Sequence, residues 1–326
     1  MKYKVQYQVK ISLAVIMCFL SICPAQGKES FTIYWENDGT FVKPNDRTDR
    51  HYTEGLKMVY TNQPACNWLR EFAKWNNFSD DKTDVSTALG YFLCQNIFTP
   101  DNVGDPKVRN YKDRVFAGWL FAGLFAQRAT TEQMEHFELK LGMIGPSTQA
   151  EYTQEMVHEI VGADAPKGWG KQLDDEFTID VTWFKRQRAD AITFSHTSNF
   201  DSHLEYGFTV GSVHRNAVLS VLFRAGFNLP NDFGPGRLEA PACAIYPAND
   251  EPMHFYVFSR FGGKLVEHDR FLTGLREKPV VGVIQVGGCL RHKSFELTYS
   301  QTFLTREYDE QPDEDSFASL TLNFRF

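Results

Sequence analysis

The last eleven residues carry the pattern that most restricts how this chain can fold. From residue 318 to the C-terminus, apolar and polar residues alternate strictly. Side chains along a β-strand point in turn to opposite faces, so this strand has one apolar and one polar face. The apolar positions are Ala318, Leu320, Leu322, Phe324 and the C-terminal Phe326. Such a strand suits a wall with lipid on one side and a polar interior on the other, although a soluble β-sandwich can also end on one.

The N-terminus has the layout of a secretory signal peptide. Three lysines stand within the first ten residues, an apolar run covers residues 11–23, and the small residues Ala25 and Gly27 follow. The apolar run is shorter than the roughly 20 residues that a membrane-spanning helix needs. We therefore expect residues 1–27 to be a cleaved signal peptide and the chain to be exported.

An exported chain can span a membrane without an apolar helix, as a closed β-barrel in which every backbone group is paired. No later segment of this sequence is apolar for long enough to cross as a helix. Aromatic residues make up 14% of the chain, enough to form girdles at the two membrane surfaces. An aromatic residue at the end of an alternating strand also resembles the assembly signal of bacterial outer-membrane barrels. The prediction is an all-β transmembrane antiparallel β-barrel in the outer membrane of a Gram-negative type of cell.

Residues 28–326 are expected to form one barrel domain of twelve strands, an even number as single-chain bacterial barrels require. The expected strands are 30–37, 51–62, 84–96, 114–127, 132–144, 176–188, 203–214, 217–227, 252–266, 279–290, 293–305 and 316–326. Residues 190–198 are an alternative short strand. The long loop 145–175 has room for short helices, and loop 228–251 is irregular. With a periplasmic N-terminus, residues 37–53, 95–113 and 145–175 share the outer rim.

Charge and cysteine content restrict the partners. Removing residues 1–27 takes away three lysines and no acidic residue, so 34 Lys and Arg become 31, against 41 Asp and Glu. This acidic balance argues against a nucleic-acid partner, and we expect a monomer. The four remaining cysteines permit three pairings, although Cys66 and Cys94 are expected at opposite rims and therefore not to pair with each other. The other two are Cys243 and Cys289.

Oxygen-bearing side chains gather where the first two strands meet the outer rim. They belong to the blocks Glu36-Asn37-Asp38 and Asp49-Arg50-His51-Tyr52-Thr53-Glu54-Gly55. Carboxylate, amide and hydroxyl oxygens are the ligands that Ca²⁺ prefers. The alternative is an ordinary solvated hairpin.

A second candidate lies in the long loop. Gln154 and His158 are four residues apart, so on a helix they share one face. An imidazole beside a cation site can deprotonate a water molecule for attack on a carbonyl. The alternative is one loop histidine among nine.

These blocks, in this order, resemble the lipid A 3′-O-deacylase (LpxR) family of outer-membrane barrels. The resemblance covers about residues 31–326 and also rests on the blocks Gln95 to Pro100, Asp113 to Trp119 and Pro166-Lys167-Gly168-Trp169. It implies a twelve-stranded barrel and a Ca²⁺-dependent esterase that removes the 3′-linked acyloxyacyl chain of lipid A in the outer leaflet of lipopolysaccharide. The active site would face the cell exterior.

The resemblance also implies roles for individual residues. Asn37, Asp38, Thr53 and Asp164 match metal-site residues, although the family is expected to have a glutamate at the position of Asp164. Gln154 matches a further active-site residue, and His158 matches the general base. The sequence departs from the family at Asn96, where a basic residue that meets the substrate phosphate is expected. Arg50, Lys107, Arg109 or Lys112 are possible substitutes in substrate binding.

A rival constellation occurs at Phe194-Ser195-His196-Thr197-Ser198-Asn199. It resembles the histidine-x-serine-asparagine element of outer-membrane phospholipase A, in which His196 would activate Ser198 as a nucleophile. The glycine expected after the asparagine is replaced by Phe200. A third interpretation is a non-catalytic barrel.

Overall fold

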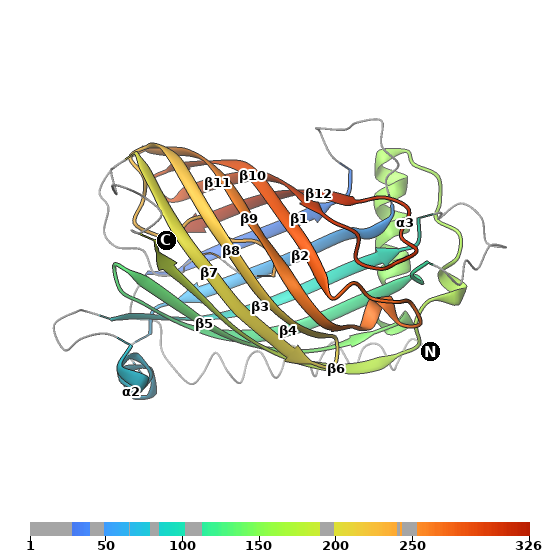
Figure 1. Ribbon diagram of the computed structural model, residues 1–326, viewed down its shortest axis with the longest axis horizontal. Helices are drawn as coiled ribbons and strands as arrows, with labels where there is room; N and C mark the ends of the chain where they lie inside the picture. Colours follow the sequence, from blue (N-terminus) through green and yellow to red (C-terminus); the bar gives the residue numbers. More distant parts are fainter. Residues whose placement is uncertain are drawn as a thin grey trace.

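The strands of this chain close into one antiparallel barrel, seen from the side in Figure 1. The computed structural model describes residues 28–39, 49–64, 66–78, 85–101, 113–189, 199–239, 242 and 253–326. Each strand pairs with its neighbours in the chain, and β12 pairs with β1 to close the wall. The strands are β1 (Ser30–Asn37), β2 (His51–Asn62), β3 (Ser86–Thr99), β4 (Ala117–Ala129), β5 (Gln133–Ile144), β6 (Glu176–Arg188), β7 (Phe200–Gly211), β8 (His214–Phe227), β9 (Met253–Asp269), β10 (Val280–His292), β11 (Phe295–Leu304) and β12 (Asp315–Arg325). The predicted twelve-stranded barrel is confirmed.

Two short helices mark the two ends of the barrel. The helix α3 (Ala150–Val161) lies at the end where β1 finishes and β2 starts, and we name this end the α3 rim. The helix α2 (Asn67–Lys74) lies at the opposite end, here the α2 rim, where β1 begins and β12 finishes. Single turns of 3-10 helix are η1 (Trp75–Asn77), η2 (Pro146–Thr148), η3 (Trp169–Lys171) and η4 (Arg270–Leu272). None of the helices in the described residues is long and apolar enough to cross a bilayer.

The C-terminal strand takes the place in the wall that its alternation predicts. Thr321 and Asn323 are buried on the lumen side, whereas Phe324 is exposed on the outside. Phe326 completes the closure, because its backbone N–H and C=O both pair with the backbone of Glu29, at 3.0 and 3.1 Å. The terminal residue therefore adds one more pair to the β1–β12 seam.

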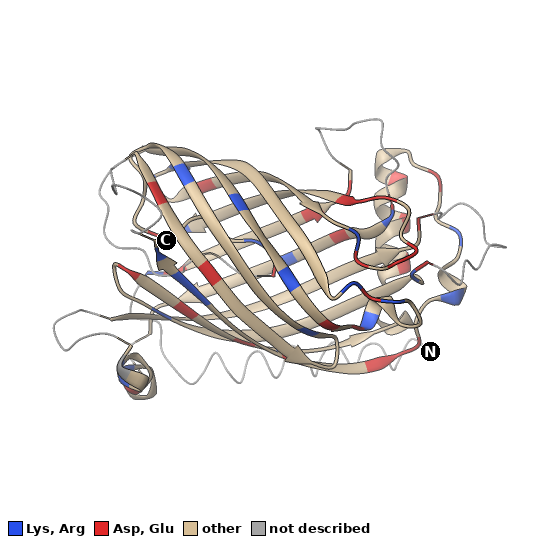
Figure 2. Cartoon of the chain, viewed as in Figure 1, with Lys and Arg blue, Asp and Glu red and all other residues tan. Residues whose placement is uncertain are grey.

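The polar faces of the strands enclose charged groups that are paired with one another. Figure 2 shows charged positions spaced singly along the strands. Within the lumen, Glu205 on β7 accepts from Arg260 at 2.6 Å and lies 2.9 Å from Arg186. Arg224 donates to Asp201 at 2.8 Å and to Asp232 at 2.6 Å. Buried charges are tolerated when they are paired in this way.

The connection between β8 and β9 folds back into the lumen. Residues 228–239, here called the lumenal segment, carry Asp232 to the Arg224 pair near the α2 rim. Farther along, the Leu238 carbonyl accepts from Lys57 Nζ at 3.1 Å, and the Leu238 N–H donates to Glu36 at 3.4 Å. A cavity occupies the lumen on the α3-rim side of this segment, and Leu238 and Glu239 line it. Residues 228–239 of the predicted irregular loop thus form an internal plug.

The strand bounds differ from the prediction most clearly between β7 and β8. The expected strands, 203–214 and 217–227, place the turn later than its observed position at Ser212 and Val213. The Asp180 carboxylate on neighbouring β6 accepts the N–H groups of Val213 and His214 at 2.9 and 3.1 Å, which holds the turn there. The alternative strand at 190–198 lies outside the described residues.

The cysteines occupy different environments. Cys66 is disulfide-bonded, whereas Cys94 and Cys289 are buried free thiols. The prediction that Cys66 and Cys94 do not pair is therefore confirmed, and Cys243 lies outside the described residues.

Candidate functional site

The helix α3 packs against the outside of the barrel wall. Asn96 on β3 lines the lumenal cavity, so its neighbours Gln95 and Ile97 point outward. Gln95 Nε2 donates to the carbonyl oxygen of Thr148 at 2.8 Å. Outward-pointing Ile97 belongs to a buried apolar cluster with Phe116, Ala150 and Trp169. Residues of α3 that face the wall therefore lie on the outside of the barrel, not over its open lumen.

Gln154 and His158 share the wall-facing side of α3, as their spacing predicts. Their side chains are only 2% and 6% exposed. The indole N–H of Trp169 donates to Gln154 Oε1 at 2.9 Å, which fixes the orientation of the amide. The amide Nε2 therefore points the other way and donates to Asp49 Oδ1 at 3.0 Å.

The end of α3 determines which nitrogen of His158 is available. Gly162 has φ of 74°, a left-handed conformation that glycine adopts without strain, and the Ala163 N–H donates to the His158 carbonyl at 2.9 Å. The chain turns back, and the Asp164 carbonyl oxygen accepts from His158 Nδ1 at 2.5 Å. A carbonyl oxygen can only accept, so Nδ1 carries the hydrogen and Nε2 faces the site. The Asp164 side chain itself is exposed.

Asp49 meets both residues from the opposite side. Its Oδ1 lies 3.1 Å from His158 Nε2, at the same atom that accepts from Gln154. Asp49 has φ of 62°, a region that aspartate enters more readily than most residues. Thr99 Oγ1 donates to the Asp49 carbonyl oxygen at 2.8 Å and holds it there. The sequence places Asp49 in the polar cluster but gives it no individual role.

Asn37, Asp38 and Thr53 come together where β1 ends and β2 begins. The Asp38 N–H donates to the Thr53 carbonyl at 3.1 Å, and Asn37 Nδ2 approaches the same oxygen at 3.3 Å. A β-bulge lies at Thr53, because Tyr52 pairs with Phe98 and Glu54 pairs with Ile97. Because of the bulge, Thr53 has no partner residue in the β2–β3 register. Its Oγ1 lies 2.7 Å from Thr99 Oγ1.

The buried carboxylate of Asp38 and nearby Asp49 place negative charge where β1 ends and β2 begins. Burial raises the pKa of the Asp38 carboxyl well above its ordinary value, the Arg50 backbone N–H lowers it in part, and nearby Asp49 raises it again. Two carboxylates with hydroxyl, amide and carbonyl oxygens around them form a set of hard donors that suits Ca²⁺. Within the described residues, no group of three or more His, Cys, Asp or Glu is arranged to hold a metal ion.

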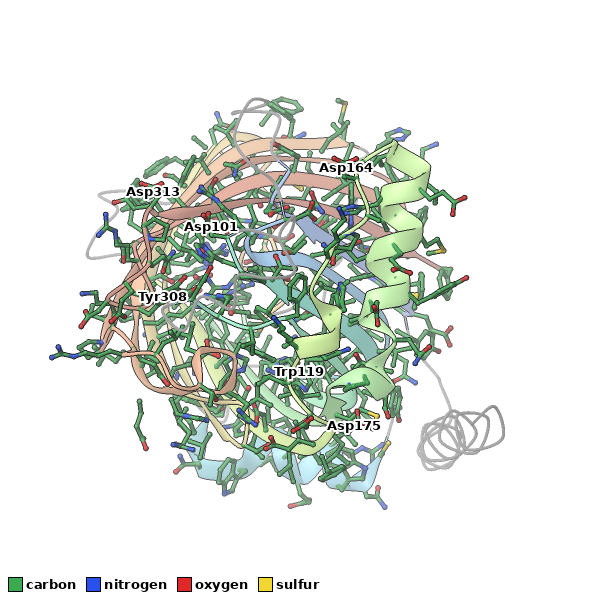
Figure 3. All side chains as sticks on the ribbon, turned by 90° about the vertical axis from the view of Figure 1, so that its right-hand side faces the viewer. Asp101, Trp119, Asp164, Asp175, Tyr308 and Asp313 are labelled. Carbon is green, nitrogen blue, oxygen red and sulfur yellow. The ribbon has the colours of Figure 1, made fainter. Side chains whose placement is uncertain are left out.

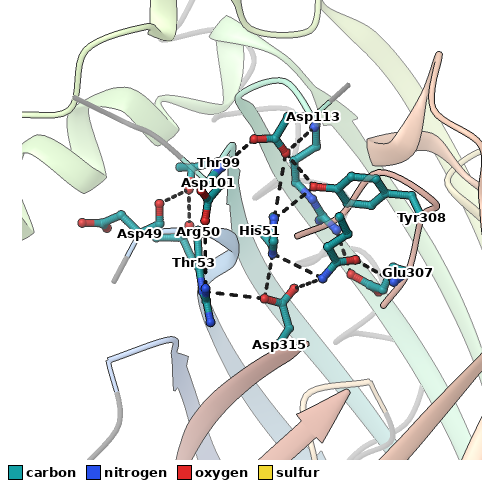
Figure 4. A network of polar contacts seen from close by, with 12 residues as sticks. Asp49, Arg50, His51, Thr53, Thr99, Asp101, Asp113, Glu307, Tyr308 and Asp315 are labelled. Atoms are coloured by element: carbon teal, nitrogen blue, oxygen red, sulfur yellow. Dashed lines mark hydrogen bonds and ion pairs between the residues drawn. The ribbon is translucent and has the colours of Figure 1, made fainter. Parts of the chain in front are cut away.

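A buried network supports the start of β2 from the other side (Figure 4). His51 Nδ1 lies 2.7 Å from Asp315 Oδ1, and His51 Nε2 lies 3.0 Å from the Tyr308 hydroxyl. Tyr308 donates onward to Asp113 at 2.7 Å. Burial, and then the bond to Asp113, raise the pKa of the Tyr308 phenol, so it remains a donor. His51 is thus clamped two residues from Asp49 and two from Thr53.

Asn96, at the position of the expected phosphate-binding residue, and its predicted substitute Arg50 direct their side chains to partners other than His158. The other predicted substitutes lie outside the described residues: Lys107, Arg109 and Lys112. Asn96 faces the lumen, where its Oδ1 accepts from the Cys94 thiol at 3.3 Å. Arg50 contributes its backbone N–H to Asp38 at 2.7 Å, while its guanidinium lies 4.0 Å from both Asp101 and Asp315. In the end-on view of Figure 3, Asp101 and Tyr308 lie on the side of the mouth away from α3, and Asp164 lies beside α3. The rival pair, His196 and Ser198, lies outside the described residues.

Comparison with known proteins places the chain in a family. The model of the family described as outer membrane protein LpxR matches residues 12–326, almost the whole chain. The chain belongs to the outer membrane protein LpxR family. A solved structure, LpxR from Salmonella typhimurium, is similar with a TM-score of 0.72 at 18% identity, covering 90% of this chain and 99% of that one. No curated protein sequence matches.

Other barrels match more distantly than the LpxR structure does. The translocator domain of the autotransporter NalP from Neisseria meningitidis has a TM-score of 0.40 at 8% identity, covering 99% of this chain and 97% of that one. The toluene transporter TodX from Pseudomonas putida has a TM-score of 0.34 at 10% identity, covering 94% of this chain and 90% of that one. Membership of the LpxR family confirms the resemblance drawn from the Glu36 to Asp38, Tyr52 to Gly55 and Pro166 to Trp169 blocks.

Proposed function

We propose that this chain is a Ca²⁺-dependent esterase that removes the 3′-linked acyloxyacyl chain of lipid A, with His158 as general base. Membership of the LpxR family supports a lipid A deacylase. The observation that carries the proposal is the placement of His158 Nε2, which points at a rim cluster of carboxylates while Nδ1 is held by the Asp164 carbonyl at 2.5 Å.

The chain's own residues supply most of the chemistry. His158 Nε2 takes a proton from a water molecule, and the hydroxide attacks the ester carbonyl carbon. Asp49, 3.1 Å away, then accepts the new N–H and stabilises the charged imidazole. When the tetrahedral adduct collapses, the bond between the carbonyl carbon and the sugar oxygen breaks, and His158 returns its proton to that oxygen, so the acyl chain leaves as a free acid. Asp38, Asn37 and Thr53 would hold Ca²⁺ beside this point, with Asp49 as an added ligand. When bound, the cation supplies positive charge for the oxyanion.

The outside of α3 fits a lipid substrate. Tyr152, Met156 and Ile160 follow one another at four-residue spacing and are 64%, 43% and 76% exposed. They form an apolar stripe on the side of α3 away from the wall, where acyl chains of a leaflet would meet it. We place the α3 rim at the cell exterior, with residues 1–27 removed on export. A monomer is sufficient for the proposed site.

Mass spectrometry of lipid A from cells that express the chain tests the activity directly. The wild type should release the 3′-linked chain, and His158→Ala should be nearly inactive, since losing a general base costs about 10²–10⁴ in rate. Ser198→Ala should stay within about tenfold of the wild type. An inactive Ser198→Ala beside an active His158→Ala would favour the phospholipase-like mechanism with His196. An unmodified lipid A in every case would favour a non-catalytic barrel.

A further inference from the structure

A charged cluster sits on the outside of the barrel wall at the α2 rim. Gln127 on β4 and His136 on β5 face the lumen and contact each other. Arg128 follows Gln127 in the chain, Glu135 precedes His136, and the two are paired across the strands. By strand alternation, Arg128 and Glu135 therefore point outward, and so does Lys185 on β6, which precedes lumenal Arg186. Arg128 and Glu135 lie within three residues of the ends of β4 and β5. A charge on the lipid face of a barrel costs least at this depth, near a membrane interface.

The segment 66–78, which we name the α2 clamp, covers this cluster. Arg128 Nη1 donates to the carbonyl oxygens of Phe72 and Trp75 at 2.8 and 2.6 Å, and thereby binds the end of α2. Its Nε and Nη2 donate to Glu135 at 2.9 and 2.5 Å, and the Phe78 ring lies 4.2 Å from the guanidinium carbon. Arg128 is consequently among the fully buried side chains although it points away from the lumen. The clamp is thus packed on the outer wall.

The other side of the clamp presents aromatic and basic groups. Trp68 and Trp75 are 47% and 57% exposed. The Trp75 ring lies 6.0 Å from the ring of outward-facing Phe137, so the clamp continues the apolar outer surface of the wall. Arg70 and Lys74, four residues apart on α2, are exposed beside it together with one acidic residue, Glu71, so these three side chains carry a net charge of +1.

We propose that the α2 clamp is an interfacial membrane-binding element that inserts Trp68 and Trp75 into phospholipid at the α2 rim. Indole rings favour the boundary between acyl chains and headgroups, because they combine a large apolar surface with one polar N–H. Arg70 and Lys74 lie where the phosphates of those lipids would be. The clamp shields the Arg128–Glu135 pair on one side and binds lipid with the other. This inference does not depend on the catalytic proposal.

Tryptophan fluorescence in vesicles tests it. The refolded barrel is placed in vesicles of phosphatidylethanolamine and phosphatidylglycerol with bromine atoms either near the carbonyl end or near the tip of the acyl chains. The double variant W68F/W75F should lose a large share of the fluorescence that shallow bromines quench. The control is Trp119→Phe, which removes a lumenal indole that lies 2% exposed and donates to Thr178. In that control the quenched fraction should rise.

Three outcomes would overturn the proposal. One is an unchanged quenched fraction in W68F/W75F that migrates as a folded, heat-modifiable barrel. Another is that aqueous acrylamide quenches the wild type in vesicles more strongly than it quenches W68F/W75F, because the two indoles would then face water. The last is shallow quenching that is weak before dilution and appears only when the protein is diluted in the membrane. A second copy, and not lipid, would then cover the clamp in the undiluted protein. Should W68F/W75F misfold, R70Q/K74Q keeps every tryptophan and is expected to show weaker shallow quenching with a reduced dependence on phosphatidylglycerol. If R70Q/K74Q is quenched as strongly as the wild type at every lipid composition, the proposal is also contradicted.

Discussion

His158 owes its orientation to a backbone carbonyl. The Asp164 oxygen accepts from Nδ1 at 2.5 Å, and that contact does not require the carboxylate of Asp164. The carboxylate on the site side belongs to Asp49, on a different segment. The observed role of Asp164 belongs to its backbone carbonyl, and metal binding by its carboxylate stays a prediction. Replacing the Asp164 side chain should leave the imidazole in place.

Asp49 is the residue whose replacement should separate orientation from basicity. In Asp49→Asn, the amide keeps the size of the side chain but loses the charge that stabilises the protonated imidazole. We expect deacylation to fall by roughly 10- to 100-fold, in the range found for groups that support a catalytic ligand. Release of the acyl chain from purified lipid A, followed by mass spectrometry, measures this. Glu151→Gln, on the exposed side of α3, is the matched control and should keep wild-type activity.

Asp38 makes a prediction about pH. Because burial raises the pKa of its carboxyl, the group is protonated over a wider pH range than an ordinary aspartate. A cation binds the ionised form, so protons and Ca²⁺ compete. The apparent Ca²⁺ affinity should therefore increase as pH rises through the elevated pKa. Calorimetric Ca²⁺ titrations at several pH values measure the effect, and Asp38→Asn should weaken binding and remove most of its pH dependence. Affinity that is independent of pH in the wild type would exclude Asp38 as a ligand.

Sequence patterns predict some of the contacts between site residues and miss others. The four-residue spacing of Gln154 and His158 is enough to place them on one helical face, and the structure confirms it. The partnership with Asp49 has no such periodic signal, because it joins residues more than a hundred positions apart through a left-handed backbone at Asp49. The same holds for His51, whose partner Asp315 follows only from closure of the barrel.

Among the elements, the turn η3 supports the site through Trp169. Gly168 precedes it with φ of 141°, and an added Cβ would lie 2.5 Å from the Phe116 ring. Gly168→Ala should displace Trp169 and release the amide of Gln154, so activity should fall while the barrel remains assembled. Gly170→Ala is the matched control, because nothing lies within 4 Å of its added Cβ. Rates on lipid A, with heat-modifiable migration as the folding check, compare the two. Equal activity of both variants would show that the position of Trp169 is not limiting.

Strand periodicity predicts the number of elements well and their edges less well. A period of two identifies twelve strands because alternate residues meet lipid and lumen. It does not reveal the bulge at Thr53, where two consecutive residues oppose one on β3. Nor does it reveal the turn at Val213, since that turn is held by Asp180 on a neighbouring strand. Both features depend on side chains brought close by the barrel itself.

At the scale of the whole molecule, the lumenal segment determines whether ions can pass through the barrel. It reaches from the Arg224 pair near the α2 rim to Glu36 near the α3 rim. Its place inside the wall could not be predicted from sequence, because Pro, Gly and Asn mark an irregular segment without saying on which side of the rim it folds.

The plug predicts an electrically silent barrel. The wild type should show no stable open-channel current in planar bilayers. Deleting residues 233–239 leaves Asp232 with Arg224 and Arg291 but removes the contacts to Lys57 and Glu36. This variant should conduct if it assembles, as judged by heat-modifiable migration. Steady current through the wild type would mean that the segment leaves the lumen.

The position of α3 outside the wall has a consequence for how the proposed enzyme meets its substrate. Gln154 and His158 lie on the side of α3 that faces the outside of the wall, so under the proposed function lipid would reach them by lateral diffusion within the leaflet. The encounter rate is then set by the mole fraction of substrate in the plane of the membrane, and bulk concentration matters little. Both the shortened lipid and the released acyl chain would likewise remain in that plane, where each competes with fresh substrate for the same two-dimensional approach.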